Sequence, residues 1–501
     1  MAYSDSSPHL TGLLLGVYRG CEPGEVVLTR EAQKFDESVM GKASQFLQSS
    51  GIAQKKTVVA HNLHDNYFAV AFTEIGPKNV GYSARENLEQ CLEMTRVGAG
   101  VGIRALQSYN VDEVHVESMS DAGAAAEGSV LGSWFFDGYR RREPLPRVPK
   151  LCPFYVGDME SWRSGVMLGE AQNLARRLSH VPPNIGSPDN MAEYALRLLC
   201  KCNVSVSVRD AEWIEKNQMF MLLNVAKGSR RSPVLLELAY CGGREDDKPA
   251  VLIGDGCTFD SWGLCLRDNK RIEYGMFNKC GGAAVIGIMK AASQLSLPLN
   301  INAFVPLYEN KPSGMALKPS SAVKSFNGKT VQVHRTSDTS RMVLSDLIGY
   351  SQNLKPNVII NVASLSSDTQ KYFNGSASVA FTEDDQMYND LYSASAITGD
   401  RVVRGPLWDF YAEKNKWPTI CDVRVVPHQY TGDAMAAAMF LEDFKPNSCK
   451  MLTLDVSGSA FLRSPRPEHY LRPGQMTGSP VRTVIQLLKQ MTCPNDKKPT
   501  C

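Results

Sequence analysis

The sequence predicts an α/β protein built of two domains. With 501 residues, the chain exceeds the roughly 250–300 residues at which a single hydrophobic core stops growing. Short apolar runs typical of strands alternate with amphipathic stretches typical of helices along the whole chain, which indicates sheets covered by helices. We expect a smaller N-terminal α/β domain over residues 1–156, a linking helix over 157–185, a larger C-terminal domain over 186–495 and a tail over 496–501.

The first domain is predicted from alternating apolar runs and amphipathic stretches. Its expected strands are Gly12–Tyr18, Thr57–Ala60, Phe68–Phe72 and Glu113–Val116. Its expected helices are Phe35–Gln48, Arg85–Leu106 and Ala122–Phe136. The basic, proline-containing stretch over residues 140–149 is typical of a surface loop.

The linking helix and the second domain follow from the same patterns. Asp158 is a suitable N-cap for a helix with apolar residues at helical spacing, and Pro182 and Pro183 end it. Beyond it, near-continuous apolar runs predict strands buried on both faces, in a mixed but mainly parallel central sheet. These runs are Val251–Ile253, Ile301–Val305, Thr330–Val333, Val358–Val362 and Met451–Val456, with helices over Ala283–Leu295 and Met342–Leu354 between them.

The composition excludes several classes of protein. A formal charge of +2 gives no general attraction to nucleic acid, and no apolar run approaches the roughly 20 residues of a membrane span. The thirteen cysteines lack a Cys-x-x-Cys pair, so we expect reduced thiols and an intracellular protein and no disulfide framework. The eight histidines include no His-Glu-x-x-His motif, so we expect structural or surface roles for them.

Two loops that follow predicted strands carry the functional signal. Ligands of doubly wound sheets bind beyond the carboxyl ends of the strands, which directs attention to the loops after Ile253 and Val333. Residues 253–263 read Ile-Gly-Asp-Gly-Cys-Thr-Phe-Asp-Ser-Trp-Gly, and residues 336–344 read Thr-Ser-Asp-Thr-Ser-Arg-Met-Val-Leu. These segments resemble the leucine aminopeptidase motifs V-G-K-G-x-T-F-D-S-G-G and N-T-D-A-E-G-R-L-x-L. With further matches over nearly the whole chain, the sequence is identified as a member of that family, which implies its two-domain α/β fold.

The resemblance also implies a site that has lost most of its ligands. Family members hold two divalent metals, zinc or manganese, which generate hydroxide from a bridging water. Of the metal-binding positions only Asp260 keeps its carboxylate. The other metal positions carry Asp255 in place of lysine, Asn278 and Ser337 in place of aspartate and Thr339 in place of glutamate. The catalytic lysine is Arg267, and the bicarbonate-binding arginine is kept as Arg341.

The charges suggest a metal-free balance at these positions. Two acidic residues, Asp255 and Asp260, stand against two arginines, so we expect an ion-pair network that includes Arg267 and Arg341. The alternative is a relocated metal site that uses Asp338, Asp268 or Glu273. We expect Asp338 to point away from the pocket, because a one-residue slip along an extended segment reverses the side chain.

The pocket walls are expected to differ from the family pattern as well. Trp262 replaces a glycine and is predicted to fill space that a substrate would use; the other expected wall residues are Gly275, Ser364 and Ser367. Three cysteines near the old site, Cys257, Cys265 and Cys280, lack an evident histidine base, so we expect small buried apolar groups and no nucleophile.

The leading functional hypothesis is a catalytically inactive family member with a structural role and no cofactor; the alternative is an active metal-dependent aminopeptidase that releases N-terminal residues. The resemblance is to the sperm leucylaminopeptidases of insects, which implies a place in the sperm flagellum or its mitochondrial derivatives, with the cytoplasm as the alternative. It also implies self-association as a homohexamer, or as a hetero-hexamer with paralogues, and contacts with flagellar or mitochondrial structural proteins. No nucleic acid or membrane partner is expected.

Overall fold

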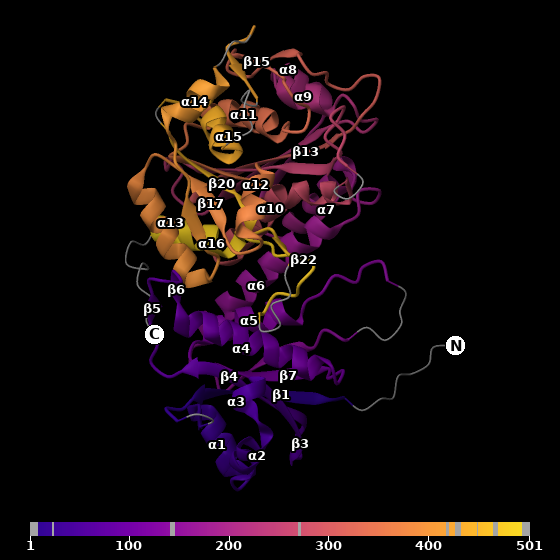
Figure 1. The fold of residues 1–501 in the computed structure, drawn as a ribbon. Helices are drawn as coiled ribbons and strands as arrows, with labels where there is room; N and C mark the ends of the chain where they lie inside the picture. The colour runs from indigo at the N-terminus through magenta and orange to yellow at the C-terminus, as the bar shows by residue number, and fades with distance from the viewer. Residues whose placement is uncertain are drawn as a thin grey trace, which may run out of the picture.

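The computed structural model describes residues 9–22, 25–140, 146–268, 272–416, 420–425, 432–447, 449–463 and 469–492. Two large mixed sheets, each covered by helices, account for most of the chain (Figure 1), so the predicted α/β class is confirmed. The domain limits at residues 156 and 186 stay a prediction, and the expected tail over 496–501 lies outside the described residues. Among the described helices, none combines the length and the apolar character needed to cross a membrane.

The N-terminal part contains a sheet with the strand order β3-β4-β1-β7-β8, and β2 pairs with β1. The strands are β1 (Thr11–Arg19), β2 (Val26–Leu28), β3 (Thr57–His64), β4 (Tyr67–Pro77), β7 (Glu113–Glu117) and β8 (Lys150–Phe154). One face buries Leu13 and Leu15 beneath α1 (Arg30–Ser38), α2 (Lys42–Ser50) and α3 (Ile52–Lys55). The other face packs against α4 (Gln90–Gln107) and α5 (Ala122–Ser133), as the lower half of Figure 1 shows.

Several predicted helix limits in this part are wrong. The expected single helix over Phe35–Gln48 is two helices, because Met40 and Gly41 have φ angles of 56° and 76°, which an α-helix of L-residues does not tolerate. Helix α4 begins at Gln90, after the short hairpin of β5 (Tyr82–Ser83) and β6 (Leu88–Glu89). Helix α5 ends at Ser133, three residues before the predicted end.

The linking helix α6 (Met159–His180) joins the two sheets. Its N-cap is Asp158 as predicted, since the carboxylate accepts a 2.9 Å hydrogen bond from the Ser161 amide. The helix contacts both α5 and α10 (Cys280–Gln294). A Cβ atom at Gly165 would lie 2.3 Å from the Gly123 carbonyl oxygen, so this glycine allows the close approach of α6 to α5.

The C-terminal part is organised around a sheet with the order β18-β17-β20-β16-β11-β13-β10-β9, with β12 paired to β13. Its strands are β9 (Ser205–Arg209), β10 (Val234–Cys241), β11 (Ala250–Gly254), β12 (Gly256–Asp260), β13 (Asn300–Asn310), β16 (Val358–Ala363), β17 (Ser378–Phe381), β18 (Val402–Arg404) and β20 (Lys450–Asp455). The central neighbours β20, β16, β11 and β13 run parallel, as the near-continuous apolar runs predict.

Helices cover both faces of this sheet. One face carries α7 (Pro188–Leu199), α10, α13 (Asp385–Thr398) and α16 (Val481–Thr492). The other carries α8 (Ala211–Lys216), α9 (Phe220–Ala226), α11 (Ser340–Ser351) and α15 (Asp433–Glu442). Within the described residues, the remaining helices are α12 (Ser367–Phe373), α14 (Asp409–Asn415) and 3-10 segments over Ile272–Lys279, Gln352–Leu354 and Val456–Gly458.

One predicted strand does not belong to the main sheet. The run expected over Thr330–Val333 forms β15 (Thr330–Gln332), which pairs with β14 (Ala322–Lys324) and β19 (Val423–Arg424) in a separate small sheet. A further two-stranded pair joins β21 (Phe461–Leu462) to β22 (Gln475–Met476). An apolar run shows that a strand is buried, but it does not show which strands lie beside it.

Candidate functional site

A cavity of about 450 Å³ lies near the carboxyl ends of the central strands, which is where doubly wound sheets bind their ligands. Its walls come from the segment after β12, the turn over Ile272–Lys279, the loop before α11, the loop after β16 and the start of α15. The predicted residues on this wall are Asp260, Trp262, Arg267, Asn278, Ser337, Arg341, Ser364 and Ser367. Three further predicted residues, Asp255, Gly275 and Thr339, are absent from the wall and buried in the protein around it.

Asp260 is the centre of the hydrogen-bond network at the cavity wall. Its Oδ1 accepts from the Trp262 amide at 2.9 Å and from Asn310 Nδ2 at 2.8 Å. Its Oδ2 accepts from Asn278 Nδ2 at 2.7 Å and from the Arg267 guanidinium at 3.3 Å. Burial raises the pKa of Asp260, and the Arg267 charge acts in the opposite direction. Both oxygens of the one kept metal-position carboxylate therefore already hold protein donors.

Arg267 and Trp262 form one side of this arrangement. The Arg267 guanidinium carbon lies 4.7 Å from the centre of the Trp262 ring, a cation–π distance. The same guanidinium donates to Asn278 Oδ1 at 3.3 Å. Trp262 has a φ angle of 70°, a conformation that favours glycine, and glycine is what the family motif carries there. Trp262 lines the cavity and its ring packs against Arg267. That the indole fills space a substrate would use stays a prediction.

Arg341 does not pair with Asp255 or Asp260. The predicted network of four charges is therefore wrong for Arg341 and Asp255. Its guanidinium lies 2.7 Å from Asp433 and 3.9 Å from Asp338. Asp255 instead accepts hydrogen bonds from the Tyr308 hydroxyl at 3.0 Å and the Cys257 amide at 3.3 Å. Burial raises the pKa of Asp255 to about 6, because no solvent stabilises its charge.

Asp338 lines the cavity, which corrects the prediction that it points away. The Ser337 hydroxyl donates to Asp338 at 2.8 Å, and Arg335 lies 3.0 Å from it. The alternation rule failed here because residues 337–339 form a turn into α11 and not an extended strand. Of the other candidates for a relocated site, Asp268 and Glu273 are not on the cavity wall.

Thr339 and Gly275 support the network from behind. Asn310 Nδ2 donates to Thr339 Oγ1 at 3.0 Å as well as to Asp260. A Cβ atom at Gly275 would lie 2.3 Å from the Asp260 carbonyl oxygen, so only glycine fits there. The sequence suggested that Gly275 is part of the pocket wall. It is instead a packing position beneath Asp260 and does not line the cavity.

Among the site residues that the sequence did not predict are three polar side chains at the ends of elements. Asn310 ends β13, and Asp455 ends β20 and accepts from the Leu365 amide at 3.0 Å. Both follow apolar runs of parallel strands, so the carboxyl-end rule could have found them. Asp433 begins α15 and reaches the site only because α15 packs beside α11, and no sequence spacing indicates that contact.

Of the three cysteines near the site, Cys257 and Cys280 are buried, whereas Cys265 is only partly buried, unlike the prediction. Burial raises the pKa of Cys280 to about 12 and the pKa of Cys257 well above its ordinary value. Cys265 donates its backbone amide to Thr336. Because a nucleophilic cysteine needs a thiolate, Cys257 and Cys280 are poorly suited to covalent catalysis.

Comparison with known proteins decides the family. Residues 173–485 match the family described as "Cytosol aminopeptidase family, catalytic domain". The chain belongs to this family. It is 34% identical over 490 residues to the cytosol aminopeptidases of Sus scrofa and of Homo sapiens, in each case covering 97% of this chain and 93% of the relative. The leucine aminopeptidase relationship inferred from the loop motifs is thus confirmed.

Solved structures confirm the fold. The bottromycin maturation enzyme BotP in complex with Mn has a TM-score of 0.81 at 24% identity, covering 97% of this chain and all of that one. A mutant of the tomato leucine aminopeptidase has a TM-score of 0.79 at 21% identity, covering 98% of this chain and 95% of that one. At these identities the likeness concerns the fold alone.

The expectation that no cofactor is involved is wrong in the light of these comparisons. The aminopeptidase family to which the chain belongs points to divalent metal cofactors, and BotP, which shares the fold, is solved in complex with Mn. The cavity residues of this chain nevertheless fit a metal pair poorly. Asp260 already has four hydrogen-bond donors, and the other former carboxylate positions offer only the neutral oxygens of Asn278, Ser337 and Thr339. We therefore derive no chemical step through a metal at this cavity.

Proposed function

We propose that this chain is a member of the aminopeptidase family that has lost peptidase turnover and serves as a structural subunit. The observation that supports the proposal is the state of Asp260. A carboxylate that binds a metal must present a free oxygen lone pair, whereas both Asp260 oxygens are held by Trp262, Asn310, Asn278 and Arg267. Arg267 also stands where the family uses lysine, and its planar guanidinium stacks on Trp262.

A second candidate is a metal-dependent aminopeptidase, and the comparisons favour it. The relatives that span 97% of this chain are named cytosol aminopeptidases. In addition, the carboxylates of Asp260, Asp338 and Asp433 line the same cavity, so the chain offers acidic side chains beside the former positions. This candidate requires Asp338 and Asp433 to leave Arg335 and Arg341, with which they are paired.

Hydrolysis of a leucine anilide separates the two candidates. The full-length chain is assayed with Mn²⁺ or Zn²⁺ added, with the pig cytosol aminopeptidase as the positive control. We expect no turnover above the rate in buffer with either metal. Metal-dependent turnover by the wild-type chain would refute the proposal. If that turnover were lost in Asp338→Asn but kept in Asp368→Asn, a control at a more exposed carboxylate of the same cavity, it would be assigned to shifted ligands.

The structural role rests on assembly. We propose that the chain associates with itself as a homohexamer, or with paralogous chains as a hetero-hexamer. Light scattering at micromolar concentration is expected to give a particle six times the mass of the 55.1 kDa chain. A stable monomer would contradict the assembly role whatever the outcome of the peptidase assay. An intracellular location in the sperm flagellum or its mitochondrial derivatives, with structural proteins there as partners, stays a prediction from the sequence resemblance.

A further inference from the structure

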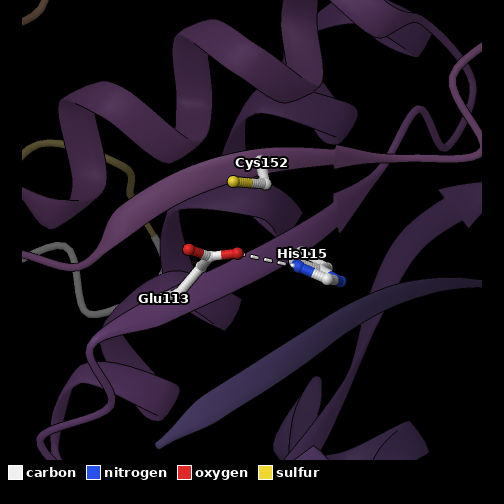
Figure 2. Close-up of side chains that lie close together, drawn as sticks. All are labelled: Glu113, His115 and Cys152. Atoms are coloured by element: carbon white, nitrogen blue, oxygen red, sulfur yellow. Dashed lines mark hydrogen bonds and ion pairs between the residues drawn. The ribbon is translucent and has the colours of Figure 1, made fainter. Parts of the chain in front are cut away.

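Three metal-ligating side chains meet on the sheet of the N-terminal part, far along the chain from the cavity residues. Glu113 and His115 lie two residues apart on β7, so they share one face of the sheet. Cys152 is the register partner of His115 on the neighbouring parallel strand β8. Figure 2 shows the three side chains gathered on these two strands.

The ligand atoms are close enough to share one ion. The side-chain donors of Glu113, His115 and Cys152 all lie within 4.8 Å of one another. Over the described part of the chain, no other group of three or more histidine, cysteine, aspartate or glutamate side chains meets this condition. The cavity of the C-terminal part therefore does not contain such a group among its described residues.

Neighbouring residues already orient two of the ligands. His115 Nδ1 lies 3.1 Å from the Tyr67 hydroxyl, which leaves Nε2 directed at Glu113 Oε1, 3.0 Å away. Lys150 Nζ lies 3.0 Å from the other carboxylate oxygen, Oε2. Hydrogen bonds that involve the outer ring nitrogen of a histidine, or that an outer carboxylate oxygen accepts, are typical of metal sites, because they fix the tautomer and direct the free ligand atom inward.

We propose that Glu113, His115 and Cys152 bind one divalent ion of the zinc type, with a water molecule as the fourth ligand. A set of one nitrogen, one sulfur and one carboxylate oxygen suits Zn²⁺, whereas Mg²⁺ and Ca²⁺ take oxygen ligands. The thiolate and the carboxylate carry two negative charges against the two of the ion, and the Lys150 ammonium at the outer carboxylate oxygen leaves the group with one net positive charge. The His115 side chain is 31% exposed and that of Glu113 19%, so the ion and its water can reach the site.

The present spacing of His115 and Glu113 requires only a small adjustment, and the Cys152 sulfur, within 4.8 Å of both ligand atoms, moves closer when the ion binds. At metal–ligand distances of about 2.0–2.1 Å, a tetrahedral ion holds its nitrogen and oxygen ligands about 3.3 Å apart. His115 Nε2 and Glu113 Oε1 are 3.0 Å apart, so the ion replaces their hydrogen bond with little movement. The Cys152 thiol loses its proton to solvent on binding, as zinc-bound thiols do.

The site would join an edge strand to the sheet. Strand β8 is at the end of the sheet order and pairs only with β7 among the described strands. A metal bridge between Cys152 and the two β7 ligands holds β8 against β7 by bonds that backbone pairing does not supply. The proposal is independent of the proposed function, because it concerns residues of the other sheet.

Cobalt titration of the full-length, metal-stripped chain tests the site. A thiolate bound to Co²⁺ gives a charge-transfer absorption band, so the band reports Cys152 directly. We expect the band in the wild-type chain and in Cys241→Ser, which removes an exposed cysteine elsewhere. We expect its loss in Cys152→Ser and His115→Ala, and a cobalt affinity weakened about 10–100-fold in Tyr67→Phe.

Two results would overturn the proposal. One is the absence of the band in the wild-type chain at saturating Co²⁺; the other is a band that persists in Cys152→Ser. An Asp260→Asn variant separates this site from the cavity, since it should leave the band unchanged. Loss of the band in Asp260→Asn would place the bound ion at the cavity, and would refute its assignment to Glu113, His115 and Cys152.

Discussion

Glu127 holds together the two halves of the chain through a buried ion triad. Its Oε2 lies 2.6 Å from Arg96 on α4 and 2.6 Å from Arg482 on α16. Both arginines are almost fully buried. Burial alone would raise the pKa of Glu127, but the two guanidinium groups outweigh it and hold that pKa below its ordinary value. We predict that Glu127→Gln destabilises the protein strongly.

The magnitude follows from the groups that the substitution leaves behind. Removing one partner of a buried ion pair costs about 3–5 kcal/mol, because the remaining charge is desolvated without compensation. Arg96 keeps Glu93 at 3.0 Å, and Arg482 keeps the Tyr470 hydroxyl at 2.9 Å, so the lower end, about 3 kcal/mol, applies. That is a large share of the roughly 5–15 kcal/mol of a typical domain.

Urea denaturation followed by circular dichroism measures the effect. The matched control is Glu86→Gln, which removes an exposed ion pair with Arg401 at 2.7 Å, also between the N-terminal and C-terminal parts. The Glu86 side chain is 49% exposed, so this change should cost less than about 1 kcal/mol. Equal unfolding midpoints for Glu127→Gln and Glu86→Gln would show that burial does not set the strength of these ion pairs. That result would refute the prediction for Glu127.

Three further predictions concern acid stability, the cavity and its support. Burial lowers the pKa of His180 from 6.5 to about 4. Between these pH values the unfolded chain binds a proton at His180 and the folded chain does not, so about 3 kcal/mol of stability is lost as the pH falls from 6.5 to 4. Urea titrations of His180→Gln at a series of pH values should lack this loss of stability. Asn278→Asp alone should give no leucine anilide hydrolysis with Mn²⁺, since Ser337 and Thr339 stay neutral; measurable turnover would contradict the argument. Gly275→Ala should destabilise the protein by about 1–3 kcal/mol through its clash with the Asp260 carbonyl, whereas the Gly157→Ala control, which meets open space, should unfold like the wild type in the same assay.

The sequence showed which residues lie at the cavity, but it did not show which side chains they contact. The motif order placed Asp260, Arg267 and Asn278 in one loop region, and these three do form one hydrogen-bonded group. The partner of Arg341 was predicted wrongly, because Asp433 arrives from a helix 92 residues further along the chain. Likewise, Asp338 lines the cavity because the local turn, not strand alternation, sets its direction.

Sequence pattern determined the α/β class, the parallel core strands and the family, since apolar periodicity and loop motifs are local properties of the chain. It did not determine that β15 leaves the main sheet, that Met40 and Gly41 divide one amphipathic stretch into two helices, or that Arg96, Glu127 and Arg482 share one buried charge cluster. Neither did it indicate that His115 and Cys152 lie side by side. These features depend on which distant segments pack together, and only the tertiary structure decides that, because side-chain contacts between distant residues leave no regular spacing in the sequence.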